Sequence, residues 1–156
     1  MSFRISGLPL ASFAHLFGLP DDELARRGAI RYVADSKPGY PDRIELRDAE
    51  VGESVLLVNY LHQPADTPYR ASHAVFVLES ARTAFDRVDD VPPTFRSRTL
   101  SLRAFDDRDM MIDAELCDGQ DVEAVIERFW RDHRICYLHA HYAKRGCYAA
   151  RIDRVQ

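Results

Sequence analysis

The sequence lacks the features that would assign it to several large classes of protein. It has only 3 cysteines among 156 residues, none of them in a Cys-x-x-Cys pair. A disulfide scaffold is therefore not expected, and a reducing compartment fits better. Lys and Arg total 21 against 25 Asp and Glu, which gives a net charge of −4 and no general basic surface for nucleic acid. The longest aliphatic run, Val55–Val58, is far too short to cross a membrane.

Common sequence signatures of phosphate binding and of nucleophilic catalysis are also missing. There is no GxGxxG, no Walker pattern and no GxSxG. The N-terminal residues have no long apolar run after a basic start, and Pro9 interrupts them, so no secretory signal is expected. We therefore expect a cytoplasmic protein without a membrane or nucleic-acid partner. No motif specifies a reaction or a cofactor.

The segments that are present predict one α+β domain over residues 1–156. The composition is 46% hydrophobic and 29% charged, which argues against disorder, and the length suffices for a core. Helical spacing of apolar residues predicts one main helix at 118–132 and short helices near the N-terminus. Apolar runs and alternation predict a central strand at 54–60, a strand at 43–47 and a hairpin at 99–116. We expect a mostly antiparallel, twisted sheet with the helices packed on it.

Residues 135–154 contain more reactive side chain types than any other segment. They predict two strands joined at Lys144-Arg145-Gly146, a three-residue loop in which Gly146 adopts a positive φ. This loop pairs even positions with even positions, which places the apolar residues on one face. A four-residue loop would move charged side chains onto that apolar face, so the pattern argues against it. The predicted polar face carries His139, His141, Cys147, Arg151 and Asp153.

The polar face offers candidate metal ligands and catalytic groups. His139 and His141 lie two positions apart on a strand and can both bind a divalent ion such as Zn²⁺, with His73 or Cys147 completing the set. The same histidines can transfer protons near neutral pH. Cys147 is either a nucleophile beside positive neighbours or a small apolar filler. An ordinary solvated face is the alternative to all of these roles.

A second group of candidates lies between the predicted strands near residues 59–73. Tyr69 and Arg70 precede His73 in a loop that enters a strand, and Asn59 lies at the end of the strand before it. Loops at strand ends often contact ligands. Arg70, together with Arg151, would hold a carboxylate or phosphate through bidentate hydrogen bonds. The alternative is a set of scattered surface side chains.

Four segments resemble the bacterial family known as domain of unknown function 1203: PGYPDRIELRDAEVGE, LLVNYLHQPADTPYRASHAVFV, RSRTLSLRAFD and YLHAHYAKRGCYAARIDR. DTPYRASH and GCYAARIDR are specific to that family, and the likeness covers almost the full length. Members often have Cys-Pro where this chain has Tyr40-Pro41, so no catalytic cysteine is expected there. Many have Asn where this chain has Tyr142. The resemblance implies a single cytoplasmic bacterial domain and no established activity.

These observations lead to two hypotheses. In the first, the 59–73 region meets the polar face of the C-terminal hairpin and forms a site for a small anionic ligand. Arg70 and Arg151 would bind the anion, and the histidines would transfer protons or bind a metal. In the second, the chain is a non-catalytic interaction or regulatory module. Its sheet edge or polar face would then contact another chain, a second copy in a homodimer included.

Overall fold

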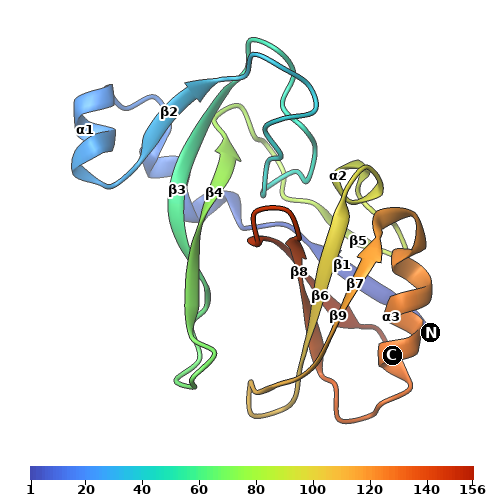
Figure 1. The fold of residues 1–156 in the computed structure, drawn as a ribbon. Helices are drawn as coiled ribbons and strands as arrows, with labels where there is room; N and C mark the ends of the chain where they lie inside the picture. The colour runs from blue at the N-terminus through green and yellow to red at the C-terminus, as the bar shows by residue number, and fades with distance from the viewer.

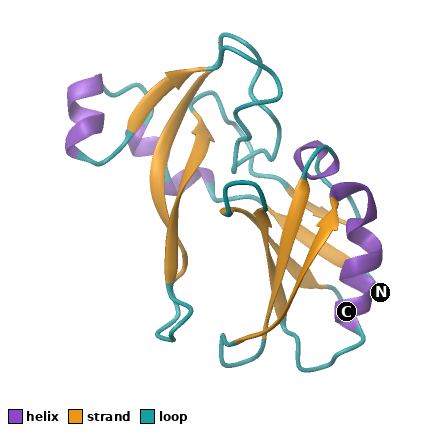
Figure 2. Ribbon diagram, in the orientation of Figure 1, coloured by secondary structure: helices purple, strands orange, loops and turns teal.

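The computed structural model describes residues 1–156 and shows nine strands in two antiparallel sheets. Figures 1 and 2 show the smaller sheet beside the larger one, which carries the longest helix. The larger sheet has the order β5-β1-β9-β8-β6-β7, with β1 (Phe3–Ser6), β5 (Asp86–Val88), β6 (Thr99–Phe105), β7 (Met111–Asp118), β8 (Tyr137–Tyr142) and β9 (Cys147–Arg154). The smaller sheet has the order β2-β3-β4, with β2 (Ile30–Val33), β3 (Ser54–Gln63) and β4 (Ala71–Leu78).

The longest helix, α3 (Val122–Trp130), covers one face of the larger sheet. Its apolar stripe is fully or almost fully buried against β6 and β8, where Leu102 and Leu138 are wholly inaccessible. Each such side chain contributes about 1.5–3 kcal/mol on burial. The 3₁₀ turn before the helix (Gly119–Asp121) begins at Asp118, whose carboxylate accepts the Gln120 N–H at 2.9 Å. The predicted main helix is confirmed, with shorter bounds.

The short N-terminal helices pack on the smaller sheet. These are two 3₁₀ turns (Leu10–Ser12 and Ala14–Leu16) and α1 (Asp21–Arg26). Their apolar side chains form a second core with β3 and β4, and β3 is the central strand, as its continuous apolar run predicted. The predicted α+β class with mostly antiparallel pairing is confirmed, and the strands divide between two sheets, each with its own core.

The strand predicted at 43–47 is wrong. The segment forms bends, closed by a single bridge between Pro41 and Asp48, and Leu46 has a φ of +55°. Asp42 is wholly buried there, and its carboxylate accepts the backbone N–H groups of Glu45 (2.6 Å) and Leu78 (2.8 Å). These side chain to backbone bonds replace the strand ladder that the alternating pattern suggested.

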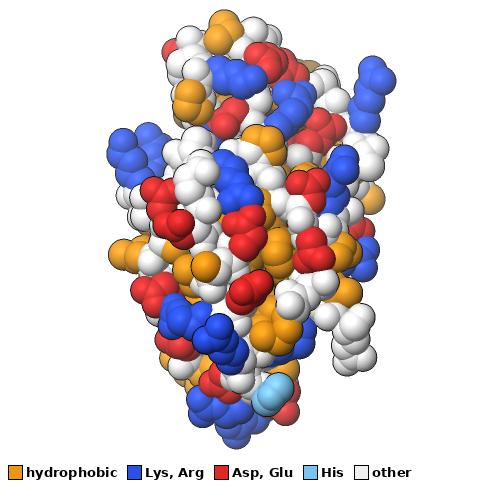
Figure 3. Space-filling model, turned by 90° about the vertical axis from the view of Figure 1, so that its right-hand side faces the viewer, with side chains coloured by type: hydrophobic (Ala, Val, Ile, Leu, Met, Phe, Trp, Pro, Cys, Tyr) orange, Lys and Arg blue, Asp and Glu red, His pale blue; other side chains and the backbone are white.

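The outer surface on the α3 side carries both signs of charge. Figure 3 shows acidic and basic side chains interleaved there, without a large patch of either sign. None of the helices has the length and apolar character needed to cross a lipid bilayer.

Glu79 ties the smaller sheet together and gives a stability prediction. Its carboxylate accepts hydrogen bonds from Arg31 of β2 (2.6 Å), from Ser54 of β3 and from the backbone N–H of Gly18 (2.8 Å). The bond from Arg31 is the main cause that lowers the pKa of Glu79 to about 2. We expect Glu79→Gln to lower the free energy of unfolding by about 2 kcal/mol at pH 7 in urea denaturation.

The pH dependence follows from the sign of this shift. A lowered carboxyl pKa stabilises the fold above the unfolded value, and the stabilisation is lost as the pH falls from about 5 to 2. The difference between wild type and Glu79→Gln should therefore shrink over that range. Glu127→Gln, at an exposed position on α3, is the control. An equal loss in both variants would contradict the assignment.

Candidate functional site

The C-terminal hairpin differs from the predicted pairing at its turn. Tyr142 pairs with Cys147, so the loop has four residues, 143–146, and not three. A bulge at Ala149 then restores the expected register, because Ala140 pairs with Ala150 and His141 pairs with Tyr148. With the bulge, a four-residue loop still leaves Arg151 on the polar face. Without a bulge, regular alternation would have put Arg151 on the apolar face.

The bulge decides which side chain shares the face of the histidines. His139 and His141 lie on one face of β8, as expected, with Arg151 opposite His139. Cys147 was expected on this face, and that prediction is wrong, because Cys147 pairs with Tyr142 on the opposite face. Tyr148 takes its place beside the histidines.

A third histidine comes from the smaller sheet. His62 lies near the end of β3 and faces β8, so that its ring centroid lies 4.9 Å from that of His141 and 6.2 Å from that of His139. One side-chain nitrogen from each residue lies within 4.8 Å of the other two. As whole residues, His62, His139 and His141 are 8%, 4% and 1% exposed. We call these three residues the histidine cluster.

The ring nitrogens of the cluster are poorly satisfied by the protein. The Nδ1 atoms of His62 and His139 are buried and have no hydrogen-bond partner. Nδ1 of His141 lies 2.9 Å from the carbonyl of Gly146. A carbonyl only accepts, so Nδ1 of His141 carries the proton and Nε2 keeps a free lone pair. Buried polar atoms are rarely left unpaired, so these nitrogens indicate a missing partner.

Burial keeps the histidines neutral. Desolvation lowers the pKa of His62 to about 4 and those of His139 and His141 to about 3, well below the ordinary value. The Tyr148 ring stacks on His62 at 5.3 Å and meets the other two rings edge-on, which shields the cluster from water. Neutral, lone-pair-bearing imidazoles are the form that binds metal ions.

Two arginines flank the cluster on the larger sheet. Arg103 of β6 and Arg151 of β9 are the strand neighbours of His139 on either side. Arg151 is paired with Asp153 (2.9 Å) and lies over the Tyr137 ring at 3.9 Å. Arg103 is half-buried and forms no ion pair, only a long contact of 3.4 Å with Ser101 Oγ. Burial lowers the pKa of the Arg103 guanidinium. An unpaired arginine beside the cluster is suited to hold an anion.

Comparison with known proteins adds a family to this geometry. The family model described as "Protein of unknown function (DUF1203)" matches residues 39–154, well over half of the chain. The chain belongs to this family. No curated protein and no solved structure matches it. The matched DUF1203 region includes all three histidines of the cluster together with Arg103 and Arg151.

The other candidates in the DUF1203 region lie outside the cluster. Arg70 is exposed, and its guanidinium donates to the carbonyl of Pro64 in its own loop. Tyr69 is 37% exposed and meets Phe105 edge-on, while Asn59 is exposed in the middle of β3. His73 lies on β4 opposite Tyr60, with Nδ1 3.0 Å from the Ala74 carbonyl. Beside desolvation, an electrostatic interaction with His73 contributes a minor part of the lowering of the pKa values of His62 and His141.

The sequence reasoning missed His62 and Tyr148. The strand was expected to end at Tyr60, whereas β3 continues to Gln63 through an irregularity in its pairing with β4. Gln63 then donates from Nε2 to the Tyr137 hydroxyl at 3.0 Å, which connects the two sheets next to the cluster. The polar side chains near residues 59–63 were placed where the predicted strand ends, and not on an inward-facing continuation of that strand.

Proposed function

We propose that this protein binds a divalent transition-metal ion, with Zn²⁺ as the reference, through the histidine cluster. The observation that carries the proposal is the convergence of His62 with His139 and His141 from two sheets, with nitrogens within 4.8 Å of one another. Two of these residues have a buried, unpartnered Nδ1. The carbonyl of Gly146 orients His141, as outer-shell carbonyls do for metal-ligating histidines.

The distances between the ring nitrogens match those of a tetrahedral zinc site after a small movement of the rings. Zinc–nitrogen bonds of about 2.0–2.1 Å in a tetrahedral site put the nitrogens roughly 3.4 Å apart. The ring nitrogens now lie within 4.8 Å of one another, so metal binding would bring them together by at most roughly 1.4 Å. Rotation of the side-chain torsions can supply this movement. Imidazole ligands suit Zn²⁺, Cu²⁺, Ni²⁺ and Fe²⁺ better than Mg²⁺ or Ca²⁺.

Three protein ligands leave one coordination position for a small molecule. Zinc in such an open site supplies a Lewis acid and activates water. The residues of this chain would do the rest. Arg103 would bind a carboxylate or phosphate of the ligand, and Tyr148 would exclude water from the far side. We therefore propose a metal-dependent function, catalytic or ligand-binding, on a small anionic molecule.

Metal analysis tests this proposal directly. We expect protein purified without a chelator or histidine tag to hold about one equivalent of metal, or to take up one equivalent of Zn²⁺. The His139→Ala/His141→Ala double variant should hold none. His15→Ala/His133→Ala, at two exposed positions, is the matched control. A wild-type protein that binds no Zn²⁺ at saturating concentration, or a double variant that binds it equally well, would refute the proposal.

A non-catalytic interaction module is the second candidate, because one sheet edge is exposed. β2 is an edge strand of the smaller sheet, and its Ile30 and Val33 are 54% and 60% exposed. Exposed apolar edges can pair with another chain. A metal-free protein that forms a dimer, and that becomes monomeric on Ile30→Lys/Val33→Lys, would favour this candidate.

A further inference from the structure

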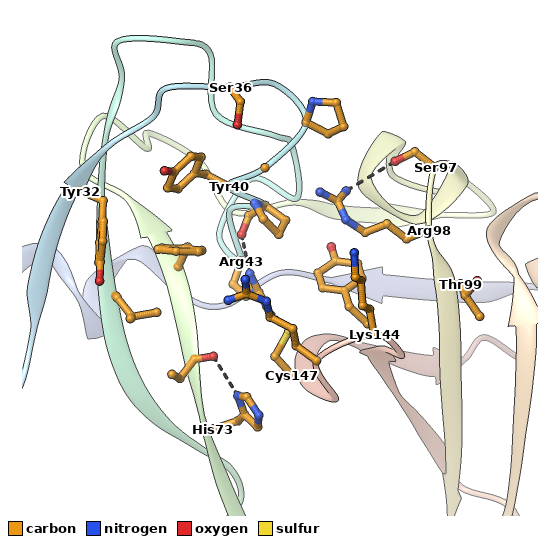
Figure 4. A pocket seen from close by; sticks show the side chains of 18 residues that line it. Tyr32, Ser36, Tyr40, Arg43, His73, Ser97, Arg98, Thr99, Lys144 and Cys147 are labelled. Atoms are coloured by element: carbon orange, nitrogen blue, oxygen red, sulfur yellow. Dashed lines mark hydrogen bonds between the residues drawn. The ribbon is translucent and has the colours of Figure 1, made fainter.

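A cavity lies beside the turn of the C-terminal hairpin, apart from the histidine cluster. It has a volume of about 760 Å³ and lies between the smaller sheet, the loop at residues 36–43 and the turn at residues 142–147. It contains none of the three histidines of the cluster. We call it the inter-sheet pocket. Figure 4 shows Arg43, Arg98, Lys144 and Cys147 among the side chains around it, with Tyr32 and Tyr40 on the opposite wall.

The pocket is positively charged. Its lining includes Arg43, Arg98, Lys144 and Arg145 and no Asp or Glu, in a chain whose net charge is −4. Arg98 is neutralised by Asp48 at 2.6 Å. Arg43 is only 1% exposed and has no carboxylate partner, because its guanidinium donates to two backbone carbonyls and to Cys147 Sγ. Lys144 and Arg145 are exposed and unpaired. This distribution attracts anions.

A buried hydroxyl in the lining is also poorly hydrogen-bonded. Tyr142 is 5% exposed, and its hydroxyl forms no hydrogen bond of normal geometry, although the Thr94 side chain lies close enough to interact with it. The guanidinium groups of Arg43 and Arg98 lie 5.0 and 5.1 Å from the centre of its ring. A buried hydroxyl that is poorly hydrogen-bonded costs free energy, which a ligand oxygen between these groups would recover.

The opposite wall is aromatic. The Phe76 ring lies 5.2 Å from that of Tyr40 and 5.9 Å from that of Tyr32, and all three line the pocket. Tyr40 is held by a hydrogen bond to Asp35 at 3.0 Å. An apolar or aromatic group can pack on this wall, whereas a bare inorganic ion would leave it uncovered.

We propose that the inter-sheet pocket binds a small organic oxyanion. Its carboxylate or phosphate lies against Arg43, Arg98 and the Tyr142 hydroxyl, and its aromatic or apolar body packs on Tyr40 and Phe76. Lys144 and Arg145 attract the anion at the entrance. The metal centre and this pocket use different side chains, so the proposal of an anion site can be tested independently of the proposed metal function.

Phenyl phosphate is the probe for this site, measured by isothermal titration calorimetry on the full-length protein at low salt. Inorganic phosphate and phenol serve as the two fragments. We expect phenyl phosphate to bind at least about tenfold more tightly than either fragment, because it engages both walls. Tyr142→Phe and Lys144→Glu/Arg145→Glu should each weaken binding by about tenfold. The second variant changes only exposed side chains, so it should fold.

Two controls make the result decisive. Arg82→Glu/Arg131→Glu carries the same charge change at exposed positions outside the pocket and should leave binding unchanged. His139→Ala/His141→Ala should also leave it unchanged. No binding of phenyl phosphate would overturn the proposal, as would an equal loss in the charge control. Binding lost only in the histidine variant would assign the anion to the metal centre and also overturn it.

Discussion

Replacing His62 with alanine should lower the affinity of this protein for Zn²⁺ by at least about a hundredfold. Loss of an outer-shell partner alone commonly costs 10–100-fold, so loss of a direct ligand should cost more than that range. His62 is the one ligand that the smaller sheet supplies, and its ring lies against His141 across the interface between the sheets. The affinity can be measured by competition with a chromogenic chelator.

The same variant should remove most of the stabilising effect of the metal. An ion held by His62, His139 and His141 joins the two sheets, so it binds the folded state only. Free Zn²⁺ at a hundred times its Kd would stabilise the wild type by about 2.7 kcal/mol. At the same Zn²⁺ concentration a hundredfold weaker variant would gain only about 0.4 kcal/mol. The Zn²⁺-dependent rise in Tm should therefore be clear in the wild type and much smaller in His62→Ala, whatever the stability of the metal-free variant.

His73→Ala is the informative control, because the sequence pattern offered His73, as an alternative to Cys147, for the third ligand. In the structure His73 lies on β4 beside the inter-sheet pocket, outside the cluster. Its replacement should leave both the affinity and the Zn²⁺-dependent Tm shift unchanged. The opposite outcome, with His73 required and His62 dispensable, would mean that the metal binds elsewhere.

The two histidines of β8 could be predicted from the sequence, and the third could not. Alternation along β8 was sufficient to place His139 and His141 on one face, since a regular strand has a period of two. His62 reaches them only through the packing of one sheet on the other. That packing depends on contacts far apart in the sequence, such as Gln63 with Tyr137, which no local pattern encodes.

Tyr148, and not Cys147, lies on the face of the histidines for a more local reason. A bulge adds one residue to a strand and inverts the faces beyond it. Here the extra residue is Ala149, next to Ala150, and both are wholly buried. Two adjacent alanines give no sign of which one is unpaired. The sequence therefore predicted the register correctly at Arg151 and incorrectly at the turn.

Arg43 was misjudged for a similar reason, and it gives the second large prediction. Alternation placed it on a strand with one solvated side. Its guanidinium is instead buried and donates to the carbonyls of Tyr148 (2.8 Å) and Pro41 (2.6 Å) and to Cys147 Sγ (3.0 Å). Two of these partners are more than 100 residues away. Hydrogen bonds from Arg43 thus connect the loop at residues 36–43 to the C-terminal hairpin.

We expect Arg43→Met to lower the free energy of unfolding by about 3–5 kcal/mol, measured by urea denaturation. Methionine fills similar space but leaves the Tyr148 and Pro41 carbonyls and the weaker acceptor Cys147 Sγ without this donor, and an unsatisfied buried carbonyl costs about 1–3 kcal/mol. Removal of a buried charge recovers part of this loss. The net change is unfavourable, since three of the five guanidinium N–H groups have acceptors in the fold, and the other two remain for an anion.

Arg43→Lys separates the charge from the hydrogen bonds. An ammonium group keeps the charge but cannot reach three acceptors placed around a planar guanidinium, so this variant should also be destabilised. Arg82→Met, at an exposed position without a side-chain partner, should change stability by less than about 0.5 kcal/mol. If Arg43→Met were as stable as the wild type while Arg43→Lys was not, the cost of burying the charge would equal the gain from its hydrogen bonds. Arg43 would then be retained for the anion that the inter-sheet pocket binds, and not for the fold.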